Sequence, residues 1–361
     1  MYIRENGTIY FHEWDRPFVA KFGEHTATQM VLAFQAEHRG LPFLYDTHQL
    51  AAFLQMNRKR LFDLVKQVDE HYDQVKIVQK NGKMRVLHVP DGALKAVQRQ
   101  IQRNILMHFL PSPHATAYIR RRTLVDNAAP HVGKKYLLKL DITDFFGSIQ
   151  FAQVYRSAFC SPYFPKQVGV LLTRLCCWQG ALPQGAPTSP ALSNLVMKSF
   201  DVYLGDWCQK HAIAYTRYCD DMTFSADRPL YMVYQKVQTM LERMGFSLHE
   251  DKTCFITRAA RQCVTGLTVN EAVSVSRVYK RQLRQELYYA QKFGLADSLR
   301  HTQRREFFTG VAPDVERYRN HLLGQVGFVL QVEPENGWFQ HARDALRKNL
   351  YEKEPQCHGK D

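Results

Sequence analysis

The segment Tyr215–Ser225, with the sequence YTRYCDDMTFS, constrains the fold more than any other part of the chain. Its two halves, Tyr215–Tyr218 and Met222–Ser225, are rich in aromatic and β-branched residues and predict two strands. Between them, Asp220 and Asp221 stand side by side at a tight turn. Adjacent negative charges repel each other, so a divalent cation such as Mg²⁺, which prefers oxygen ligands, would stabilise the pair. Because Asp is also common in turns for backbone reasons alone, this segment by itself leaves both interpretations open.

A third predicted strand has a carboxylate near its end. Tyr136–Ile142 is a short apolar run that carries Asp141 near its end. If this strand lies beside the hairpin, Asp141, Asp220 and Asp221 meet at one end of a sheet. Three carboxylates so placed are the ligand set for two divalent ions about 4 Å apart, which stabilise the attacking and leaving oxygens of an in-line phosphoryl displacement. The sequence therefore predicts a metal-dependent phosphoryl-transfer site.

The charge balance predicts a polyanionic partner. The 361 residues include 48 Lys and Arg against 34 Asp and Glu, a net charge of +14, and 45% of the residues are hydrophobic. A globular chain of this kind is expected to bind nucleic acid, although a generic basic protein has the same balance. The eight cysteines form no CxxC pair, and neither a signal peptide nor an apolar run of transmembrane length is recognisable. We therefore expect a cytoplasmic protein without a membrane partner.

Several further elements follow from local patterns. Thr47–Gln67 predicts one helix, and Val264–Asn270 predicts a short strand. Two apolar runs between residues 75 and 89 flank an Asn-Gly pair and predict a β-hairpin that carries Lys83 and Arg85. From residue 277 the chain is expected to be helical, with basic residues along one face: Arg277, Lys280, Arg281 and Arg284. Such a helix can lie along a phosphate backbone, and a solvated charged face is an equal alternative.

Taken in order, five segments resemble motifs A to E of reverse transcriptases. Motifs A, B and C are matched by Leu140–Phe146, Pro183–Pro190 and Tyr218–Asp221, and motifs D and E by Gly245–Thr253 and Gly266–Asn270. Two shorter segments, at residues 127–131 (NAAPH) and 264–266 (VTG), are similar to the NAxxH and VTG motifs of retron reverse transcriptases. In motif D, His249 stands where the family usually has Asn, for which we expect a local change and not a loss of activity.

The resemblance implies an α+β fold, a right-hand polymerase with fingers, a palm of antiparallel sheet backed by helices, and a helical thumb. The expected division is an N-terminal helical segment (1–70), fingers (71–135), a palm with inserted finger elements that holds motifs A to E (136–270), and a helical thumb with a C-terminal tail (271–361).

The resemblance also implies an activity. An RNA-directed DNA polymerase, a nucleotidyltransferase, would use dNTPs and two Mg²⁺ ions, with Mn²⁺ as the alternative ion. In the retron family a cognate noncoding RNA is both template and primer, through the 2′-OH of a guanosine, and the product is branched multicopy single-stranded DNA. Members typically act in anti-phage defence with an effector, which we expect here to be a separate protein.

The resemblance, together with the basic residues named above, assigns roles to particular positions. Asp141, Asp220 and Asp221 are expected to be catalytic and to bind the metal ions, with the backbone carbonyl of Ile142 as a further ligand. The expected nucleotide-binding residues are Phe146, Gln184, Gly185, Lys83, Arg85 and Lys252. The expected RNA-binding residues are Asn127, His131, Val264, Thr265, Gly266, Arg277, Arg281 and Arg284.

Two of these positions have a specific expected function, each with a structural alternative. Phe146 is the expected steric gate, because a ring packed under the sugar would clash with a ribose 2′-OH; a core phenylalanine is the alternative. Lys252 is the expected proton donor to pyrophosphate, with a structural lysine as the alternative.

Other classes share part of this pattern. A group II intron or diversity-generating reverse transcriptase is one alternative, but an intron enzyme normally carries a maturase region, for which a chain ending at Asp361 leaves little room. An RNA-dependent RNA polymerase tends to lack a bulky residue at the position of Phe146. A non-catalytic RNA-binding scaffold is the third alternative, and it has no need for all three carboxylates.

Overall fold

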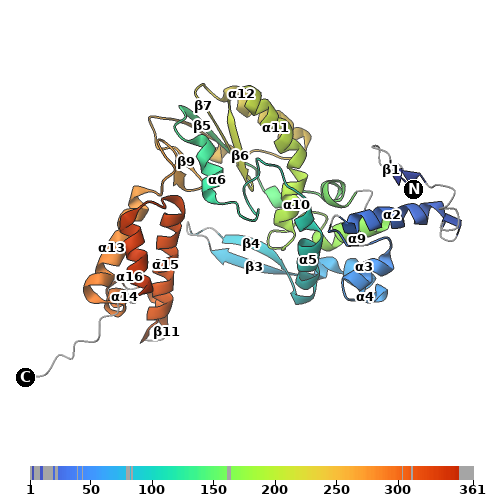
Figure 1. Ribbon diagram of the computed structural model, residues 1–361, viewed down its shortest axis with the longest axis horizontal. Coiled ribbons are helices and arrows are strands. Elements are labelled where there is room, and N and C mark those ends of the chain that lie inside the picture. Colours follow the sequence, from blue (N-terminus) through green and yellow to red (C-terminus); the bar gives the residue numbers. More distant parts are fainter. Residues whose placement is uncertain are drawn as a thin grey trace, which may run out of the picture. The chain divides into compact units, whose positions relative to one another are not determined.

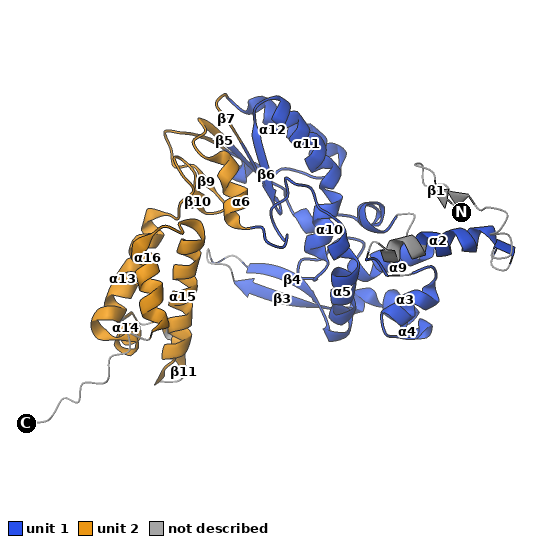
Figure 2. Ribbon diagram, in the orientation of Figure 1, with its two compact units in different colours: residues 1–122, 138–224, 229–254 blue, residues 123–137, 225–228, 255–361 orange. Residues whose placement is uncertain are grey.

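Contacts divide the chain into two compact units, which Figure 2 shows in separate colours. The computed structural model describes residues 2–3, 9–10, 19–20, 23–38, 40–42, 44–78, 82, 84–160, 164–302, 304–309 and 312–348. Unit 1 comprises Met1–Arg122, Leu138–Phe224 and Pro229–Cys254, and unit 2 comprises Thr123–Leu137, Ser225–Arg228 and Phe255–Asp361. Helices and small antiparallel sheets are mixed along the chain (Figure 1), which confirms the predicted α+β class.

Most elements precede residue 255. The helices of unit 1 are α2 (Glu24–His38), α3 (Thr47–Phe53), α4 (Arg58–Lys66), α5 (Gly92–Asn104), α7 (Phe145–Ser148), α8 (Phe151–Val154), α9 (Lys166–Cys176), α10 (Ser189–Val196), α11 (Lys198–Lys210) and α12 (Tyr231–Arg243). Its short helical turns are η2 (Val68–His71), η3 (Leu106–His108), η5 (Tyr155–Phe159) and η6 (Glu250–Lys252). The strands up to this point are β1 (Tyr2–Ile3), β2 (Ile9–Tyr10), β3 (Tyr72–Val78), β4 (Met84–Pro90), β5 (Tyr136–Asp141), β6 (Ala214–Tyr218), β7 (Asp221–Ala226) and β8 (Cys254–Thr257).

Unit 2 is mainly helical. Its helices and helical turns are α6 (Leu124–Ala128), η4 (Ala129–His131), α13 (Arg277–Phe293), α14 (Leu295–Thr302), η7 (Arg305–Phe307), α15 (Val315–Val332) and α16 (Gly337–Arg347). Its short strands are β9 (Cys263–Val264), β10 (Leu267–Thr268), β11 (Phe308–Thr309) and β12 (Ala312–Pro313). No helix formed by the described residues is both long and apolar enough to cross a lipid bilayer.

A four-stranded sheet carries the acidic residues. Its strand order is β6-β7-β5-β8, and the turn at residues 219–220 joins β6 to β7, so the predicted hairpin is confirmed. The rings of Tyr215 on β6 and Phe224 on β7 stack with their centroids 4.7 Å apart, and α11 packs against β6. Because β5 lies beside β7, Asp141 at the end of β5 comes next to Asp221 at the start of β7.

The predicted basic hairpin forms a separate two-stranded sheet. Strands β3 and β4 pair from Tyr72 opposite Pro90 to Val78 opposite Met84, and Figure 1 shows them side by side in light blue. Asn-Gly turns match the right-handed twist of paired strands, which explains why the local sequence predicts this pairing. Lys83, in the connection between the strands, lies outside the described residues.

Two predicted elements are wrong in detail. The single helix predicted over Thr47–Gln67 is two helices, α3 and α4, because Gln55 takes a left-handed conformation with φ of 57° and Asn57 caps α4 through a 2.8 Å bond from the backbone N–H of Arg60. The strand predicted near residue 264 is a hairpin of β9 and β10, whose connection contains Thr265 with φ of 45° and Gly266 with φ of 87°.

A buried ion pair stands behind the hairpin of β6 and β7. The guanidinium of Arg217 and the carboxylate of Asp201 on α11 are both fully buried, with Nη2 and Oδ2 2.6 Å apart and Nε donating to Oδ1 at 2.8 Å. The hydroxyl of Tyr215 also donates to Asp201 at 2.8 Å, and Arg217 Nη1 donates to Asn194 on α10 at 3.2 Å. Buried charges are tolerated when they are paired and bonded in this way.

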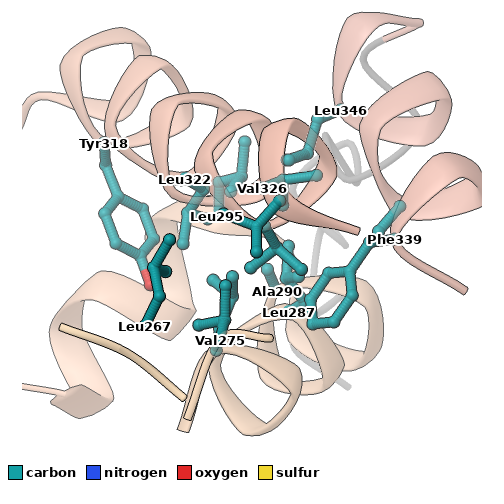
Figure 3. Packing of buried hydrophobic residues seen from close by; sticks show 14 of the residues in the cluster. Leu267, Val275, Leu287, Ala290, Leu295, Tyr318, Leu322, Val326, Phe339 and Leu346 are labelled. Atoms are coloured by element: carbon teal, nitrogen blue, oxygen red, sulfur yellow. The ribbon is translucent and has the colours of Figure 1, made fainter. Parts of the chain in front are cut away.

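Unit 2 has its own hydrophobic core. Figure 3 shows side chains from the helices and from the β10 region that point toward one another. The labelled members are Leu267, Val275, Leu287, Ala290, Leu295, Tyr318, Leu322, Val326, Phe339 and Leu346. Burying one such aliphatic or aromatic side chain contributes about 1.5–3 kcal/mol, so these contacts stabilise the packing of α13, α14, α15 and α16.

His131 is part of the interior of unit 2. Its side chain is fully buried, and Nδ1 lies 2.7 Å from the hydroxyl oxygen of Ser225. Burial lowers the pKa of His131 to about 3, because the charged imidazolium would lose its hydration. The histidine is therefore neutral in the folded protein over the whole physiological pH range.

Replacing Arg217 by Met should leave the carboxylate of Asp201 buried without its cation. We expect the free energy of unfolding, measured by urea denaturation, to fall by about 3–5 kcal/mol. As a control, Arg300→Met removes an ion pair with Asp297 whose side chains are each 63% exposed, and should cost less than about 1 kcal/mol. Equal losses in the two variants would contradict the role of the buried pair.

The neutral His131 predicts an acid-sensitive fold. Because its folded-state pKa lies below the value near 6.5 in the unfolded chain, the unfolded chain takes up a proton first as the pH falls below that value. This group should therefore lower the free energy of unfolding by about 1.4 kcal/mol for each pH unit between roughly 6 and 4.

The measurement compares the pH dependence of urea unfolding in the wild type and in His131→Gln, which should have a flatter profile below pH 6.5. His341→Gln, at an exposed position on α16, is the control and should keep the wild-type slope. Parallel profiles for wild type and His131→Gln would show that the buried histidine does not govern this dependence.

Candidate active site

The structure brings the three predicted carboxylates to one edge of the sheet. The backbone N–H of Ile142 donates to the carbonyl of Asp220 at 3.3 Å, which fixes the end of β5 against the turn. The side chains of Asp221 and Asp141 are in contact. Burial raises the pKa of Asp221 to about 6, and the negative charges of Asp220 and Asp141 add to the rise. Positive charge at this edge would relieve the crowding.

Lys252 supplies one such charge. Its ammonium donates to both carboxylate oxygens of Asp141, at 2.8 and 2.9 Å, while half of the lysine side chain stays exposed. The segment before it is bonded to the end of β5, with His249 N–H donating to the carbonyl of Asp141 at 2.8 Å and Thr143 N–H donating to Ser247 at 2.9 Å. His249 thus holds Asp141 through its backbone, and that bond does not depend on whether the side chain is His or Asn.

The donor set fits a divalent cation of the Mg²⁺ type. Within the described residues, no three His, Cys, Asp or Glu side chains are grouped closely enough to enclose a metal ion by themselves. Mg²⁺ does not need such a cage, because it is commonly held by one or two carboxylates and completes its coordination with water and substrate phosphates. Two carboxylates in contact, with a third on the adjacent turn and an ammonium at their side, agree with that mode of binding.

The turn that carries Asp220 is held in place by residues that the sequence did not predict. Cys219 is in a left-handed conformation with φ of 62°, and its carbonyl accepts a hydrogen bond from Arg217 Nη1 at 2.9 Å. The hydroxyl of Tyr118 donates to Cys219 Sγ at 3.4 Å. Burial, Cys219 and the charge of Asp220 raise the pKa of Tyr118, so this hydroxyl stays a donor. Arg217 had one recognisable signal in the sequence, a charge within an otherwise uncharged strand.

Phe146 lies one turn beyond the acidic edge. Asp144 stands at the N-cap position of α7 with φ of 40°, so the chain turns sharply after β5 and Phe146 lies at the start of the helix. The ring is half-buried and lies 5.5 Å from the ring of Phe145, which is buried and packs 6.1 Å from Phe246. Phe145 is therefore the core residue of this pair, while Phe146 keeps an accessible face.

Gln184 and Gly185 are held by β4. The carbonyl of Gln184 accepts from His88 N–H at 2.8 Å, and its side-chain oxygen accepts from Arg85 Nε at 3.0 Å. Gly185 has φ of 124°, and a Cβ at this position would lie 2.9 Å from the carbonyl oxygen of His88. Only glycine permits this close approach of the loop to the strand. Arg85, which is exposed, and the two loop residues therefore form one local group in unit 1.

The predicted RNA-binding positions in unit 2 separate into buried and exposed members. Asn127, His131 and Val264 are buried, and Asn127 Nδ2 donates to Thr265 Oγ1 at 3.3 Å. This bond supports the connection between β9 and β10, where Gly266 is exposed. Asn127 therefore supports this connection directly, while His131 is bonded to Ser225, and none of the three buried residues has an exposed side chain to offer a ligand.

The three predicted arginines of α13 are exposed. Arg277 begins the helix behind the cap of Ser276, and Arg281 follows one turn later. Arg284 lies over the rings of Trp338 and Phe339 on α16, with its guanidinium carbon 5.4 and 5.1 Å from the ring centres. Stacking on the rings holds this guanidinium in place while its edge stays open to solvent.

Comparison with known proteins agrees with these motifs. The model of the family described as reverse transcriptase (RNA-dependent DNA polymerase) matches residues 77–301, more than half of the chain. The chain is 28% identical over 309 residues to the retron Ec86 reverse transcriptase of Escherichia coli, covering 84% of this chain and 89% of that protein. It is 31% identical over 280 residues to the retron Ec83 reverse transcriptase of Escherichia coli, covering 73% and 84%.

Among solved structures, telomerase from Candida albicans in complex with a fragment of telomeric RNA is similar over 81% of this chain and 67% of that chain. The TM-score is 0.40 at 10% identity, so the structural similarity is low. The family match and the retron relatives carry the assignment on their own. This chain belongs to the reverse transcriptase family and is a retron-type RNA-directed DNA polymerase.

Proposed function

We propose that this protein synthesises DNA on a cognate noncoding RNA at the edge formed by Asp141, Asp220 and Asp221. The observation that carries the proposal is the contact between the Asp141 and Asp221 carboxyl groups at the ends of two neighbouring strands. In this proposal the RNA is both template and primer, a guanosine 2′-OH starts synthesis from dNTPs, and the product is branched multicopy single-stranded DNA. The net charge of +14 supports a nucleic-acid partner.

Asp141, Asp220, Asp221 and the backbone carbonyl of Ile142 would hold two Mg²⁺ ions, or Mn²⁺ in their place. When bound, such ions supply charge stabilisation for the attacking and leaving oxygens of phosphoryl transfer. The raised pKa of Asp221 supports this assignment, because it reflects repulsion between neighbouring carboxylates that a bound cation would relieve. Arg217 keeps the turn rigid, so the carboxylates need no rearrangement during the reaction.

The neighbouring residues would orient the incoming nucleotide. The accessible face of Phe146 would pack under the deoxyribose and exclude a 2′-OH. Gln184 and Gly185, held on β4, would line the nucleotide site, and Arg85 would be drawn toward the triphosphate with Lys83. Lys252, bonded to Asp141, has a proton to offer to the departing pyrophosphate.

The remaining parts of the proposal concern the RNA and the cellular role. The connection at Thr265 and Gly266 and the exposed arginines of α13 would contact the RNA, while Asn127, His131 and Val264 would hold that surface in shape. We assign fingers, palm and thumb to residues 71–135, 136–270 and 271–361, after an N-terminal segment 1–70. The protein would act in the cytoplasm in anti-phage defence, with a separate effector protein.

Asp220→Asn keeps the size of the side chain but removes one charge of the proposed metal site. We expect DNA synthesis to fall by at least about 10²–10³-fold, while the affinity for the cognate RNA changes little. Incorporation of labelled dNTPs and RNA binding by filter retention measure the two effects. Asp206→Asn, at an exposed position on α11, is the control for loss of a negative charge. Undiminished synthesis by Asp220→Asn would eliminate the metal argument.

Phe146→Val removes the proposed gate and should admit ribonucleotides. The ratio of kcat/KM for a dNTP to that for the matching rNTP should fall by about tenfold or more, because the clash with the 2′-OH is lost. Single-nucleotide incorporation on a fixed primer–template measures this ratio. Phe62→Val, on the exposed side of α4, serves as control. If the sugar selectivity of Phe146→Val stays at the wild-type value, Phe146 is a packing residue only.

A further inference from the structure

Tyr118 lies against the turn of the candidate active site in an unusual conformation. Its φ is 62°, in the left-handed region that bulky side chains rarely adopt. Its hydroxyl donates to the sulfur of Cys219, the residue directly before Asp220, at 3.4 Å. Despite this contact, the residue is 54% exposed. Tyr118 thus combines a strained backbone, a fixed hydroxyl and an accessible ring.

The same buried network that holds the turn also holds the segment before Tyr118. Thr116 donates to the carbonyl of Arg217 from its N–H at 2.9 Å and from its hydroxyl at 3.1 Å. Asn194 Nδ2 donates to the carbonyl of Ala117 at 2.9 Å. The backbone is therefore fixed on both β6 and α10 up to the residue preceding Tyr118. A strained backbone conformation of this kind persists only where many surrounding contacts hold it in place, and residues with such strain are frequent at ligand-binding sites.

Packing alone does not account for this ring. The aromatic residues that serve the core of the same hairpin, Tyr215 and Phe224, are 5% and 0% exposed. Tyr118 instead stands at a cavity of about 470 Å³, together with the exposed apolar side chains of Met107 and Leu110. Arg120 also lines this cavity and is exposed. An aromatic ring, apolar walls and a guanidinium are the combination that receives a nucleotide, with the ring for its base or sugar and the cation for its phosphate.

We propose that Tyr118 is a nucleic-acid-binding residue whose ring packs against the terminal nucleotide of the strand being extended. This inference rests on the proposed function, in which Asp220 and its neighbours are the catalytic centre. Because the reacting hydroxyl must come to those carboxylates, the nucleotide that carries it comes within reach of Tyr118, whose own hydroxyl is bonded to Cys219 beside Asp220. The bond from the hydroxyl of Tyr118 to Cys219 fixes the ring relative to the turn that carries Asp220. The end of the nucleic-acid strand and the carboxylates are therefore positioned by the same part of the protein.

Two substitutions separate the ring from the hydroxyl. Tyr118→Leu removes the ring and should raise the KM for a DNA primer annealed to an RNA template by roughly 5- to 150-fold, the range of lost base–aromatic stacking, with kcat at saturating primer within about threefold of wild type. Tyr118→Phe keeps the ring and should retain the wild-type KM while kcat falls modestly, because the tether to Cys219 is lost. Tyr203→Leu, 56% exposed on α11, is the control and should change neither value.

A measurement of primer–template binding in a variant that does not synthesise DNA tests this inference separately from the proposed function. Fluorescence anisotropy of the labelled primer–template is compared between Asp220→Asn and the double variant Asp220→Asn/Tyr118→Leu, and the double variant should bind more weakly by the same factor as the rise in KM. An unchanged affinity in the double variant, or a lower kcat and thermal midpoint of Tyr118→Leu at constant KM, would show that Tyr118 is only structural. Full synthesis by Asp220→Asn would instead remove the proposed catalytic centre and leave the binding comparison intact.

Discussion

The buried contact between Arg217 and Asp201 is the interaction on which the acidic edge depends. A guanidinium without access to water is tolerated because a carboxylate, an amide and a backbone carbonyl together accept hydrogen bonds from four of its five N–H donors. That carbonyl belongs to Cys219. The guanidinium that neutralises the buried carboxylate of Asp201 therefore also fixes the left-handed turn before Asp220. The protein thus links the stability of its sheet to the position of its candidate catalytic residues.

The second constraint is the mutual repulsion of carboxylates at the sheet edge. The contact between Asp141 and Asp221, with Asp220 beside them, raises the free energy of the ionised state, which is expressed in the elevated pKa of Asp221. Lys252 compensates part of this charge from the segment bonded to the end of β5. Such an arrangement suits a polymerase that binds divalent cations together with its nucleotide substrate. The cations then neutralise both the carboxylates and the negative charge of the triphosphate.

Local sequence predicted the elements whose conformation is decided by neighbouring residues. The Asn-Gly hairpin of β3 and β4 and the hairpin of β6 and β7 were predicted correctly because turn chemistry and alternation are short-range properties. The break between α3 and α4 was not predicted, because the apolar spacing continues across Gln55, whose left-handed conformation ends α3, and Asn57, which caps α4. The hairpin at Thr265 was likewise predicted to be a strand, because its two strands are so short that their apolar residues form one continuous pattern across the turn.

The sequence by itself determined the family of this protein, and it identified Asp141, Asp220 and Asp221 as the three carboxylates that we propose to be catalytic. Tertiary structure alone decided which residues support that triplet. The pairing of residues 114–116 with β6 and the hydrogen bond from Tyr118 to Cys219 join segments far apart in the chain. No local propensity encodes such contacts, because their free energy comes from excluding water between surfaces that meet only after the chain has folded.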